Sequence, residues 1–261
     1  MIAIDKDVLY DIAPRNSGAR AARQTEIVEA IGWVLEQTLE DYQIDTRLRA
    51  AHFLAQICHE SDGFCTTEEY ASGQAYEGRS DLGNTQHGDG PRFKGRGLLQ
   101  LTGRANYKTF GDALGVDLVG HPEQSAEPQT SLRIACEYWR RRNINKYCDQ
   151  DDLISVTRAV NGGLNGLESR REYLAKAKAA LARLEAAGIA ANAPADSPPT
   201  LRRGASGEPV ATLQTRLRAK GFPVAIDGSF GPGTEVAVMR LQETHGLQAD
   251  GIVGPQTWVL L

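Results

Sequence analysis

Two glutamates, Glu60 and Glu69, stand nine residues apart on either side of a short glycine-containing segment. Glu60 directly follows an apolar run that ends in Ile57 and Cys58, and Gly63 suits the left-handed conformation in which helices commonly end. Unpaired carbonyl groups at a helix C-terminus and neighbouring apolar side chains both disfavour a negative charge. The carboxyl group of Glu60 is therefore suited to stay protonated near neutral pH, as a general acid must.

The second glutamate belongs to the run Glu68-Glu69-Tyr70, which is too close to Glu60 for another long helix to intervene. Two carboxyl groups about 6.5–9.5 Å apart across a cleft suit an inverting glycosidase, in which one protonates the leaving oxygen and the other activates a water. The residues alone leave two interpretations open, an acid–base pair and a set of solvated surface glutamates. They also do not decide between Glu68 and Glu69.

Metal and nucleophile chemistry find little support in the residues. His59 and Glu60 match the first two positions of the zinc-peptidase motif HExxH, but Gly63 stands where the second histidine belongs. We therefore expect no metal site and no cofactor, and we expect His59 to be a hydrogen-bond partner rather than a base. The cysteines match no zinc pattern and are expected to be reduced thiols, with Cys58 filling the core. They are Cys58, Cys65, Cys136 and Cys148.

Helices are expected to position these glutamates. Apolar residues recur at helical spacing in five segments, and the sequence therefore predicts a mainly α structure for this part of the chain. The segments are 24–41, 47–58, 130–142, 151–160 and 168–187. By contrast, residues 72–97 contain eight glycines or prolines, more than a packed element tolerates. A long loop of this kind inside a compact domain is usually functional.

A second, smaller domain is expected at the C-terminal end. Residues 186–200 contain six alanines, three prolines and no aromatic side chain, so we interpret them as a linker. Beyond it, DGSFGPGT at 227–234 recurs as DGIVGPQT at 250–257, and the Asp and Gly residues of both copies are expected to form structural turns. We predict a compact three-helix unit over 201–261, which at about 60 residues is suited to binding rather than to catalysis.

The composition of the whole chain agrees with two soluble domains. Its 261 residues are 41% hydrophobic and 24% charged, values typical of globular proteins. The formal net charge of -4 offers no basic field for nucleic acid or for an anionic membrane. Asp5, Asp7 and Asp11 interrupt the N-terminal segment where a signal peptide needs an apolar run, and no stretch is long enough for membrane insertion. We therefore expect a monomer that is made in the cytoplasm.

Three long segments resemble one known family. They are AHFLAQICHESDGF at 51–64, YEGRSDLGNTQHGDGPRFKGRGLLQLTGRANY at 76–107 and VTRAVNGGLNGLESRREYL at 156–174. Over roughly residues 20–185 the chain is similar to the family 19 chitinase-like glycoside hydrolases, specifically their phage endolysin branch. Residues 201–261 resemble the helical peptidoglycan-binding domain of cell-wall hydrolases. The resemblance implies a lysozyme-like helical catalytic domain over 1–185 and a small wall-binding domain after the linker.

The same resemblance assigns roles to individual residues. Glu60 falls on the family's general acid and Glu69 on its water-activating base, with Glu68 at the neighbouring, weaker position. Thr102, in GLLQLTGR, takes the Ser/Thr position that holds the attacking water, a task for which a hydroxyl group can both donate and accept. Gln100 and Asn161 match polar positions that line the sugar cleft, and Arg170 matches an arginine that the family uses near the catalytic acid. These three residues and Tyr70 are the candidates for substrate binding.

Structural interpretations of these substrate-contacting positions stay open. Gln100 and Asn161 could instead brace their loops through bonds to the backbone, and Arg170 could be an exposed helical charge. The segment from Tyr70 to Ser72 departs from the Asn-Leu-Asn type that relatives often have, so the resemblance does not define the sugar contacts there.

The sequence therefore predicts an endolysin that hydrolyses β-1,4 glycosidic bonds of bacterial peptidoglycan with inversion during host lysis. A chitinase and a lytic transglycosylase remain as alternatives of related chemistry, and a non-catalytic wall-binding protein as one of a different class. The wall-binding tail disfavours the chitinase, and Glu69 disfavours the transglycosylase, which needs a single glutamate. Family habit places synthesis in the host cytoplasm and action in the cell wall or periplasm, after a separate protein permeabilises the membrane.

Overall fold

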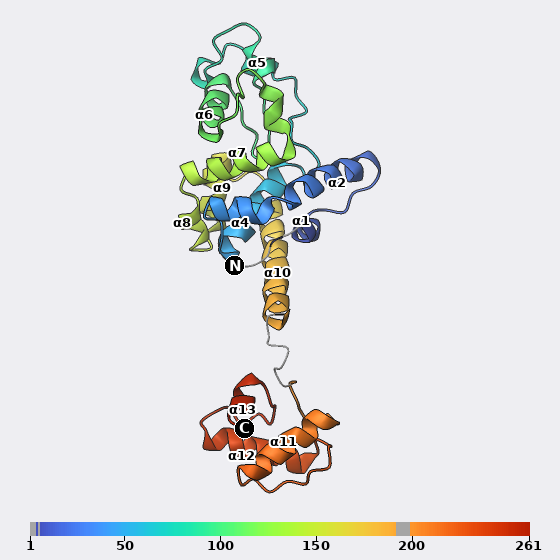
Figure 1. The fold of residues 1–261 in the computed structure, drawn as a ribbon. Coiled ribbons are helices and arrows are strands. Elements are labelled where there is room, and N and C mark those ends of the chain that lie inside the picture. The colour runs from blue at the N-terminus through green and yellow to red at the C-terminus, as the bar shows by residue number, and fades with distance from the viewer. Residues whose placement is uncertain (1–3, 5, 192–198) are drawn as a thin grey trace. The chain divides into compact units, whose positions relative to one another are not determined.

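The computed structural model describes residue 4 and residues 6–191 and 199–261 (Figure 1). The chain divides into two compact units, Met1–Ala191 and Asn192–Leu261, called here the N-terminal and the C-terminal unit. In the described residues the regular structure is helical, and β-structure is limited to isolated bridges, which confirms the mainly α prediction. None of the described helices is both long and apolar enough to cross a membrane.

The N-terminal unit is built around one buried helix. Its longer helices are α1 (Lys6–Ile12), α2 (Gly18–Gly32), α3 (Leu35–Asp41), α4 (Arg47–Glu60), α6 (Arg104–Leu114), α7 (Pro128–Arg141), α9 (Leu153–Asn161) and α10 (Leu167–Ala191). The short ones are η1 (Gln74–Tyr76), η2 (Ser80–Leu82), α5 (Asp89–Arg92), η3 (Pro122–Ala126) and α8 (Asn145–Cys148). Helix α4 packs against α1, α8, α9 and α10, and every residue from Ala50 to Cys58 is buried.

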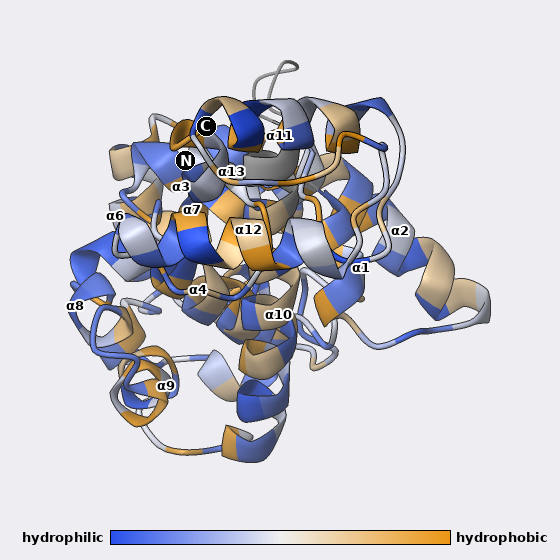
Figure 2. Cartoon of the chain, turned by 90° about the horizontal axis from the view of Figure 1, so that it is seen from below, coloured by the Kyte–Doolittle hydropathy of each residue, from blue (hydrophilic) through white to orange (hydrophobic). Residues whose placement is uncertain are grey.

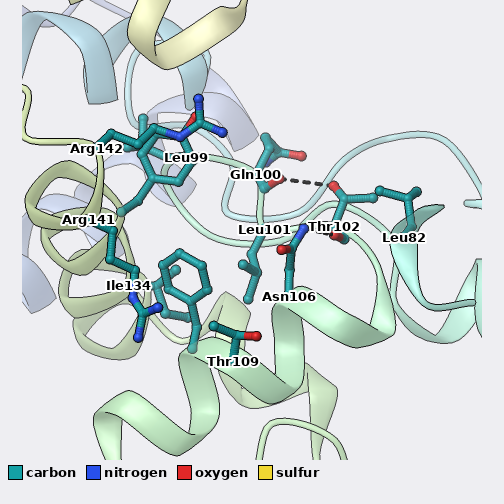
Figure 3. A pocket seen from close by; sticks show the side chains of 12 residues that line it. Leu82, Leu99, Gln100, Leu101, Thr102, Asn106, Thr109, Ile134, Arg141 and Arg142 are labelled. Atoms are coloured by element: carbon teal, nitrogen blue, oxygen red, sulfur yellow. Dashed lines mark hydrogen bonds between the residues drawn. The ribbon is translucent and has the colours of Figure 1, made fainter.

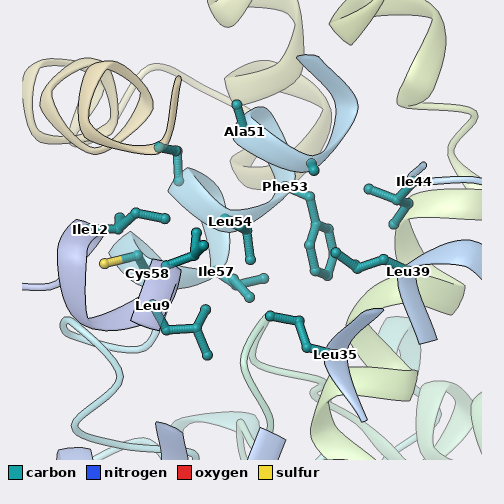
Figure 4. Close-up of a cluster of buried hydrophobic side chains, with 14 of the residues drawn as sticks. Leu9, Ile12, Leu35, Leu39, Ile44, Ala51, Phe53, Leu54, Ile57 and Cys58 are labelled. Carbon is teal, nitrogen blue, oxygen red and sulfur yellow. The ribbon is translucent and has the colours of Figure 1, made fainter. Parts of the chain in front are cut away.

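The main hydrophobic core forms where α4 meets its neighbours. Figure 4 shows Leu9 of α1, Leu35 of α3 and Phe53 of α4 converging on it with other apolar side chains. Helix α10 contributes Leu174 and Leu181, and in Figure 2 hydrophobic and hydrophilic segments alternate along this helix. Burial of each large apolar side chain contributes about 1.5–3 kcal/mol, so this core holds the end of α4 in a fixed place.

The helix predicted over 24–41 is interrupted in the structure. It forms two helices, α2 and α3, that are separated at Trp33 and Val34. Gly32, at the break, lies against the start of α1, since a Cβ atom on Gly32 would stand 2.6 Å from the Cβ of Lys6. The apolar stripe continues across the break because both helices face the same core, so hydrophobic spacing alone does not reveal it.

The irregular segment 72–97 is braced by buried polar side chains. Asn84 donates to the carbonyl of Tyr76 (2.9 Å) and accepts from the backbone N–H of Arg104 (2.8 Å), the first residue of α6. The buried carboxylate of Asp89 accepts from Arg104 Nε (2.9 Å). Beside this segment, a second hydrophobic cluster includes Phe93 and side chains of α6 and α7. The glycine-rich segment is therefore a packed wall rather than a loose loop.

Helix α10 continues to Ala191, so the first six residues of the expected linker 186–200 are helical. Residues 192–198 lie outside the described residues. The first described residues of the C-terminal unit contact its C-terminal end. The carbonyl of Pro199 accepts from Trp258 Nε1 (2.9 Å), and Leu201 pairs with Val253. The helical part of the expected linker is rich in alanine, which favours a helix more than other residues do.

The C-terminal unit contains α11 (Glu208–Ala219), α12 (Pro232–Thr244) and α13 (Pro255–Val259), as the three-helix prediction requires. Each Asp-Gly turn wraps around a buried glutamine whose amide donates to the Asp carboxylate and to a Thr hydroxyl. The triplets are Gln214, Asp227 and Thr234 in the first copy and Gln242, Asp250 and Thr257 in the second. The Asp residues of both turns are therefore structural, because their carboxylates hold the turn on the helix before it.

Candidate active site

Glu60 is the last residue of α4, and its carboxylate accepts a hydrogen bond from Arg170 on α10. The side chain of Arg170 is fully buried and that of Glu60 is 19% exposed, so the pair opens to solvent only on the Glu60 side. Arg170 is thus not an exposed helical charge. The ion pair therefore fixes the position of the Glu60 carboxylate at the end of α4.

Behind Arg170 lies a buried polar network that the sequence analysis did not identify. Arg170 donates to the side-chain oxygen of Gln56 through Nη1 and to the carbonyl of Asn165 through Nε (3.0 Å). The amide of Gln56 donates in turn to Thr157 Oγ1 (3.4 Å), and Gln56 and Thr157 are fully buried. Because unpaired buried polar groups are costly, this network fixes the orientation of the guanidinium that contacts the catalytic candidate.

A left-handed turn leads from α4 toward the second glutamate. Asp62, Gly63 and Phe64 have φ values of 53°, 72° and 62°. Gly63 is required there, because a Cβ atom would lie 2.6 Å from the ring of Pro14, and its carbonyl accepts from buried Gln24 (2.6 Å). Successive left-handed residues cost conformational free energy, and such strain is commonly retained at functional sites.

Among the described residues, the donors to the carboxylate of Glu69 are neutral. The backbone N–H of Gly95 donates to Oε1 (2.8 Å), and the hydroxyl of Tyr76 donates to Oε2 (3.0 Å). Partial burial and the hydrogen bond to Glu69 raise the pKa of Tyr76, which keeps its hydroxyl protonated as a donor. Both oxygens of Glu69 are therefore oriented without a cation that would compete for them, a setting suited to a general base.

Glu68 has a different environment although it is the adjacent residue. Its carboxylate contacts Arg96 Nε at 2.9 Å and Lys94 Nζ at 3.2 Å. Burial raises the pKa of Glu68, but the hydrogen bond from Lys94 and the charge of Arg96 outweigh it and lower the pKa below its usual value. Glu68 thus links its own segment to that of Lys94 and Arg96. Its lowered pKa makes it a poor proton acceptor.

A cavity of about 340 Å³ opens between the loop at 99–102, α6 and α7 (Figure 3). Gln100 and Thr102 line it, and the hydroxyl of Thr102 donates to the carbonyl of Gln100 (3.0 Å). Gln100 has a φ of 49°, an uncommon value for a residue with a side chain. Its amide also donates to the carbonyl of Gly97 (3.1 Å), so part of its role is to brace the loop.

Gln100 connects this cavity with Glu69. A Cβ atom on Gly95 would lie 2.6 Å from Gln100 Oε1 and 3.3 Å from the carboxylate of Glu69, so both side chains flank the same glycine. A residue with a side chain at position 95 would push them apart. Glu69 therefore lies close to Gln100, which lines the cavity together with Thr102, and a shared catalytic role of these three residues stays a prediction.

Tyr138 connects the same cavity with Glu60. It lines the cavity, and its hydroxyl donates to the carbonyl of Val160 (2.9 Å). Burial raises the pKa of Tyr138, Arg142 lies 4.5 Å from its ring and lowers it, and the negative charge of Glu60 raises it. The charge of Glu60 thus reaches Tyr138 on one side of the cavity. Glu69 lies next to Gln100, which also lines the cavity.

Asn161 and Tyr70, like Glu60, Glu69 and Arg170, do not line the cavity. Asn161 is the exposed last residue of α9, directly after Val160, to whose carbonyl Tyr138 donates. Tyr70 is 79% exposed, and its hydroxyl donates to Asp62 (3.2 Å). Their contacts with sugar stay predictions.

His59 acts as a structural partner in this geometry. Its Nδ1 lies 2.7 Å from Ser169 Oγ, and burial together with the charge of Arg170 lowers its pKa. The cysteines are free and buried, and Cys58 fills the main core as predicted. In the part of the chain that the structure describes, no three His, Cys, Asp or Glu side chains are grouped to hold a metal ion.

Comparison with known proteins agrees with this geometry. Residues 34–159 match the family of class I chitinases, and residues 206–261 match the family of peptidoglycan binding domains. The chain carries a glycoside hydrolase family 19 domain. A glycosyl hydrolase family 19 domain-containing protein of Haemophilus influenzae is 29% identical over 175 residues, which cover 55% of this chain and 85% of that protein. The enzyme is thus a glycoside hydrolase.

Two further relatives cover one unit each. Chitinase C from Streptomyces griseus has the same fold, with a TM-score of 0.50 and 20% identity over 69% of this chain and 77% of that one. The zinc D-Ala-D-Ala carboxypeptidase of Streptomyces albus G is 52% identical over 64 residues, which cover 23% of this chain and 24% of that enzyme. The chain therefore spans about a quarter of the carboxypeptidase, and the similarity is confined to one domain.

Proposed function

We propose that this glycoside hydrolase cleaves the β-1,4 bonds of bacterial peptidoglycan by an inverting acid–base mechanism. The observation that carries the proposal is the contrast between two glutamates that adjoin residues of one cavity, Glu69 through Gln100 and Glu60 through Tyr138. Glu60 is held by the buried guanidinium of Arg170, whereas the donors that the described residues provide to Glu69 are neutral. The peptidoglycan-binding domain in the same chain supports the choice of substrate.

Each glutamate has one task in the proposed reaction. Arg170 contacts Oε1 of Glu60, which leaves the other oxygen to carry the proton that is given to the glycosidic oxygen. As the bond from the anomeric carbon to this oxygen breaks, oxocarbenium-like charge develops on the sugar. Glu69 takes a proton from a water positioned with the help of Thr102, and this water attacks the opposite face and inverts the anomeric centre.

Positive charge in the cavity favours peptidoglycan over chitin as the substrate. Arg141 and Arg142 both line the cavity. Arg142 donates to the carbonyl of Ala159 (3.0 Å), and Arg141 contacts the carboxylate of Glu137 (2.6 Å). Chitin is a neutral polymer, whereas the peptide stems of peptidoglycan carry carboxylates, which guanidinium groups bind well.

The C-terminal unit supports the same substrate in a second way. Once it has bound the wall, the tethered catalytic domain experiences a raised local concentration of glycan strands without any new contact in the active site. A lytic transglycosylase would need Glu60 but not an oriented Glu69. A wall-binding protein without activity would need neither glutamate.

We also propose that the enzyme serves as a phage endolysin, as the sequence resemblance and the pairing of domains favour. In this role it accumulates in the host cytoplasm and reaches the wall after a separate protein permeabilises the membrane. Expression in a bacterial host tests the release step. Lysis is expected only when a pore-forming protein is expressed with the chain, and lysis without one would contradict this step.

Purified cell walls test the proposed activity. The intact chain should lower wall turbidity and release new reducing ends. Glu60→Gln keeps the shape of the side chain but has no acidic proton to give, so its rate should fall on the order of 10²–10⁴-fold while the protein stays folded. Parent-like rates in folded Glu60→Gln, or a parent that cleaves chitin but not walls, would contradict the proposal.

A further inference from the structure

The second Asp-Gly repeat of the C-terminal unit borders a cavity of about 260 Å³. Its lining includes Leu247, Gln248, Asp250, Ile252 and Gln256. The volume lies just below the about 300–1,000 Å³ of typical small-molecule sites, so it suits one sugar unit better than a longer peptide stem.

The floor of the cavity is a rigid hydrogen-bonded unit. Gln242 is 2% exposed, and its Nε2 donates to Asp250 Oδ1 (2.9 Å), to the Ile252 carbonyl (2.9 Å) and to Thr257 Oγ1 (3.1 Å). Its Oε1 accepts from the backbone N–H of Gly251 (3.0 Å). The floor therefore uses its hydrogen-bonding capacity internally and supports the groups at the rim in fixed positions.

The rim offers polar groups and an apolar surface to a ligand. Gln248 and Gln256 are exposed amides for which the described residues provide no side-chain hydrogen bond, and the same holds for the Oδ2 atom of Asp250. Ile252 is 39% exposed, and Leu247 is half-buried beside it. This combination of a carboxylate, two amides and a small apolar surface matches the hydroxyl, amide and methyl groups of an N-acetylated sugar.

The first repeat has a different surface at the corresponding place. Its loop from Gly221 to Asp227 is two residues longer than the loop from Gly246 to Asp250, and Phe222 and Val224 of the longer loop pack against the core. The position of Gln256 is taken by Gly233 in the first copy, which therefore has no amide there. The two repeats share the same scaffold, but the second carries the groups suited to a ligand.

We propose that the cavity of the second repeat binds one N-acetylated sugar of the glycan strand. In this arrangement the N–H of the acetamido group donates to Asp250, its methyl group contacts Ile252, and the two glutamine amides bind sugar hydroxyls. The carboxylate disfavours the acidic peptide stems, so the ligand is the glycan rather than the peptide. The inference rests on the proposed function, because it takes peptidoglycan as the polymer that this unit binds.

Sedimentation with purified walls tests the inference in the full chain. All proteins carry Glu60→Gln so that the walls stay intact during the measurement. Gln248→Ala combined with Gln256→Ala should weaken wall binding about tenfold, since two hydrogen bonds to the sugar are lost. The matched control is Gly233→Ala, which adds a methyl group in open space at the equivalent position of the first repeat and should leave binding unchanged.

Competition identifies the ligand in the same assay. Glycan strands freed of peptides by an amidase should displace the chain, and free stem peptides should not. Unchanged binding of the double variant, or displacement by stem peptides alone, would overturn the inference but not the proposed function, provided that the chain with its native Glu60 still hydrolyses walls in a separate assay. A chain with its native Glu60 that neither sediments with walls nor releases reducing ends from them would overturn the proposed function as well.

Discussion

Glu68 and Glu69 are neighbours in the chain but differ in their partners, and this difference gives a direct prediction. Glu69→Gln should lower the rate on walls on the order of 10²–10⁴-fold, because it removes the proposed general base. Glu68→Gln should keep activity within about tenfold and lower the Tm by no more than a few degrees, since its ion pairs are partly exposed. Rates on walls and thermal unfolding of both variants provide the measurement, and the opposite order of activities would place the base at Glu68.

A buried histidine predicts how stability depends on pH. His52 is fully buried in α4, its Nε2 lies 2.8 Å from Asp151 Oδ1, and burial lowers its pKa although Asp151 opposes the shift. In the unfolded chain this pKa is about 6.5. The unfolded state therefore binds more protons below this pH, so the stabilisation is complete above pH 6.5 and is lost as the pH falls.

The Tm should consequently fall by about a few degrees between pH 7 and pH 5. His59, whose pKa burial also lowers, acts in the same direction. His52→Gln cannot titrate and should show a smaller decrease over this range. A parent Tm that is constant or higher at pH 5, or an equal decrease in the variant, would contradict this account.

At the residue scale, the sequence predicted the groups that belong to long motifs. Glu60 and Arg170 stand in segments that resemble a family, and Glu69 was assigned by its spacing of nine residues from Glu60. Gln56 and Tyr76 stand in such segments as well, but their roles were not predicted, because these roles arise from hydrogen bonds that form only in the folded chain. Gln56, for instance, meets Arg170 across 114 residues of chain, and no local pattern records this contact.

At the element scale, the junction between α9 and α10 packs against His59, the residue before the catalytic candidate in α4. Gly166 in this junction has a φ of 70°, and a Cβ atom on it would lie 2.2 Å from the ring of His59. Gly162 has a φ of 78° but has no neighbouring atom within 4 Å of such a Cβ. The two glycines therefore share the left-handed conformation and differ in the close contact.

Alanine at the two glycines separates these effects. Gly162→Ala should lower the free energy of unfolding by about 1–2 kcal/mol, the cost of a left-handed conformation. Gly166→Ala should cost more and should also reduce activity, because the ring of His59 must move away from its place beside Glu60. Denaturant unfolding and rates on walls measure both effects. Equal losses of stability and activity in the two variants would show that the contact of residue 166 with His59 affects neither.

The helices themselves were predicted better than their ends. The expected helices at 47–58, 130–142, 151–160 and 168–187 correspond to α4, α7, α9 and α10. The break between α2 and α3 escaped the sequence analysis because it depends on the contact of Gly32 with α1. Hydrophobic spacing reports which face is buried, not which helix passes close by.

At the scale of the whole molecule, the two units should be separable. A chain that ends at Ala191 retains the main core and the cavity of the N-terminal unit. It should cleave soluble glycan fragments at the rate of the intact chain and act at least about tenfold more weakly on walls, because it lacks the tethered binding unit. Aggregation of this chain, or loss of activity on soluble fragments, would show that the units depend on each other.

The internal repeat shows what the sequence could reveal about the C-terminal unit. The Asp-Gly turns recur at an offset of 23 residues and were found directly. The buried glutamines were missed, because Gln214 precedes its aspartate by 13 residues and Gln242 precedes its own by 8. Because the two loops differ in length, the repeated hydrogen bond between glutamine and aspartate becomes visible only in the folded structure.

The configuration of the newly formed reducing end tests the central claim most directly. Glycan strands digested with the full chain can be followed by the anomeric proton coupling before the sugar equilibrates. The proposed acid–base pair predicts that each cut of a β-1,4 bond first yields the α-anomer, and that Glu69→Gln suppresses this product. A first product in the β configuration, or an anhydro end that forms without water, would contradict the inverting mechanism.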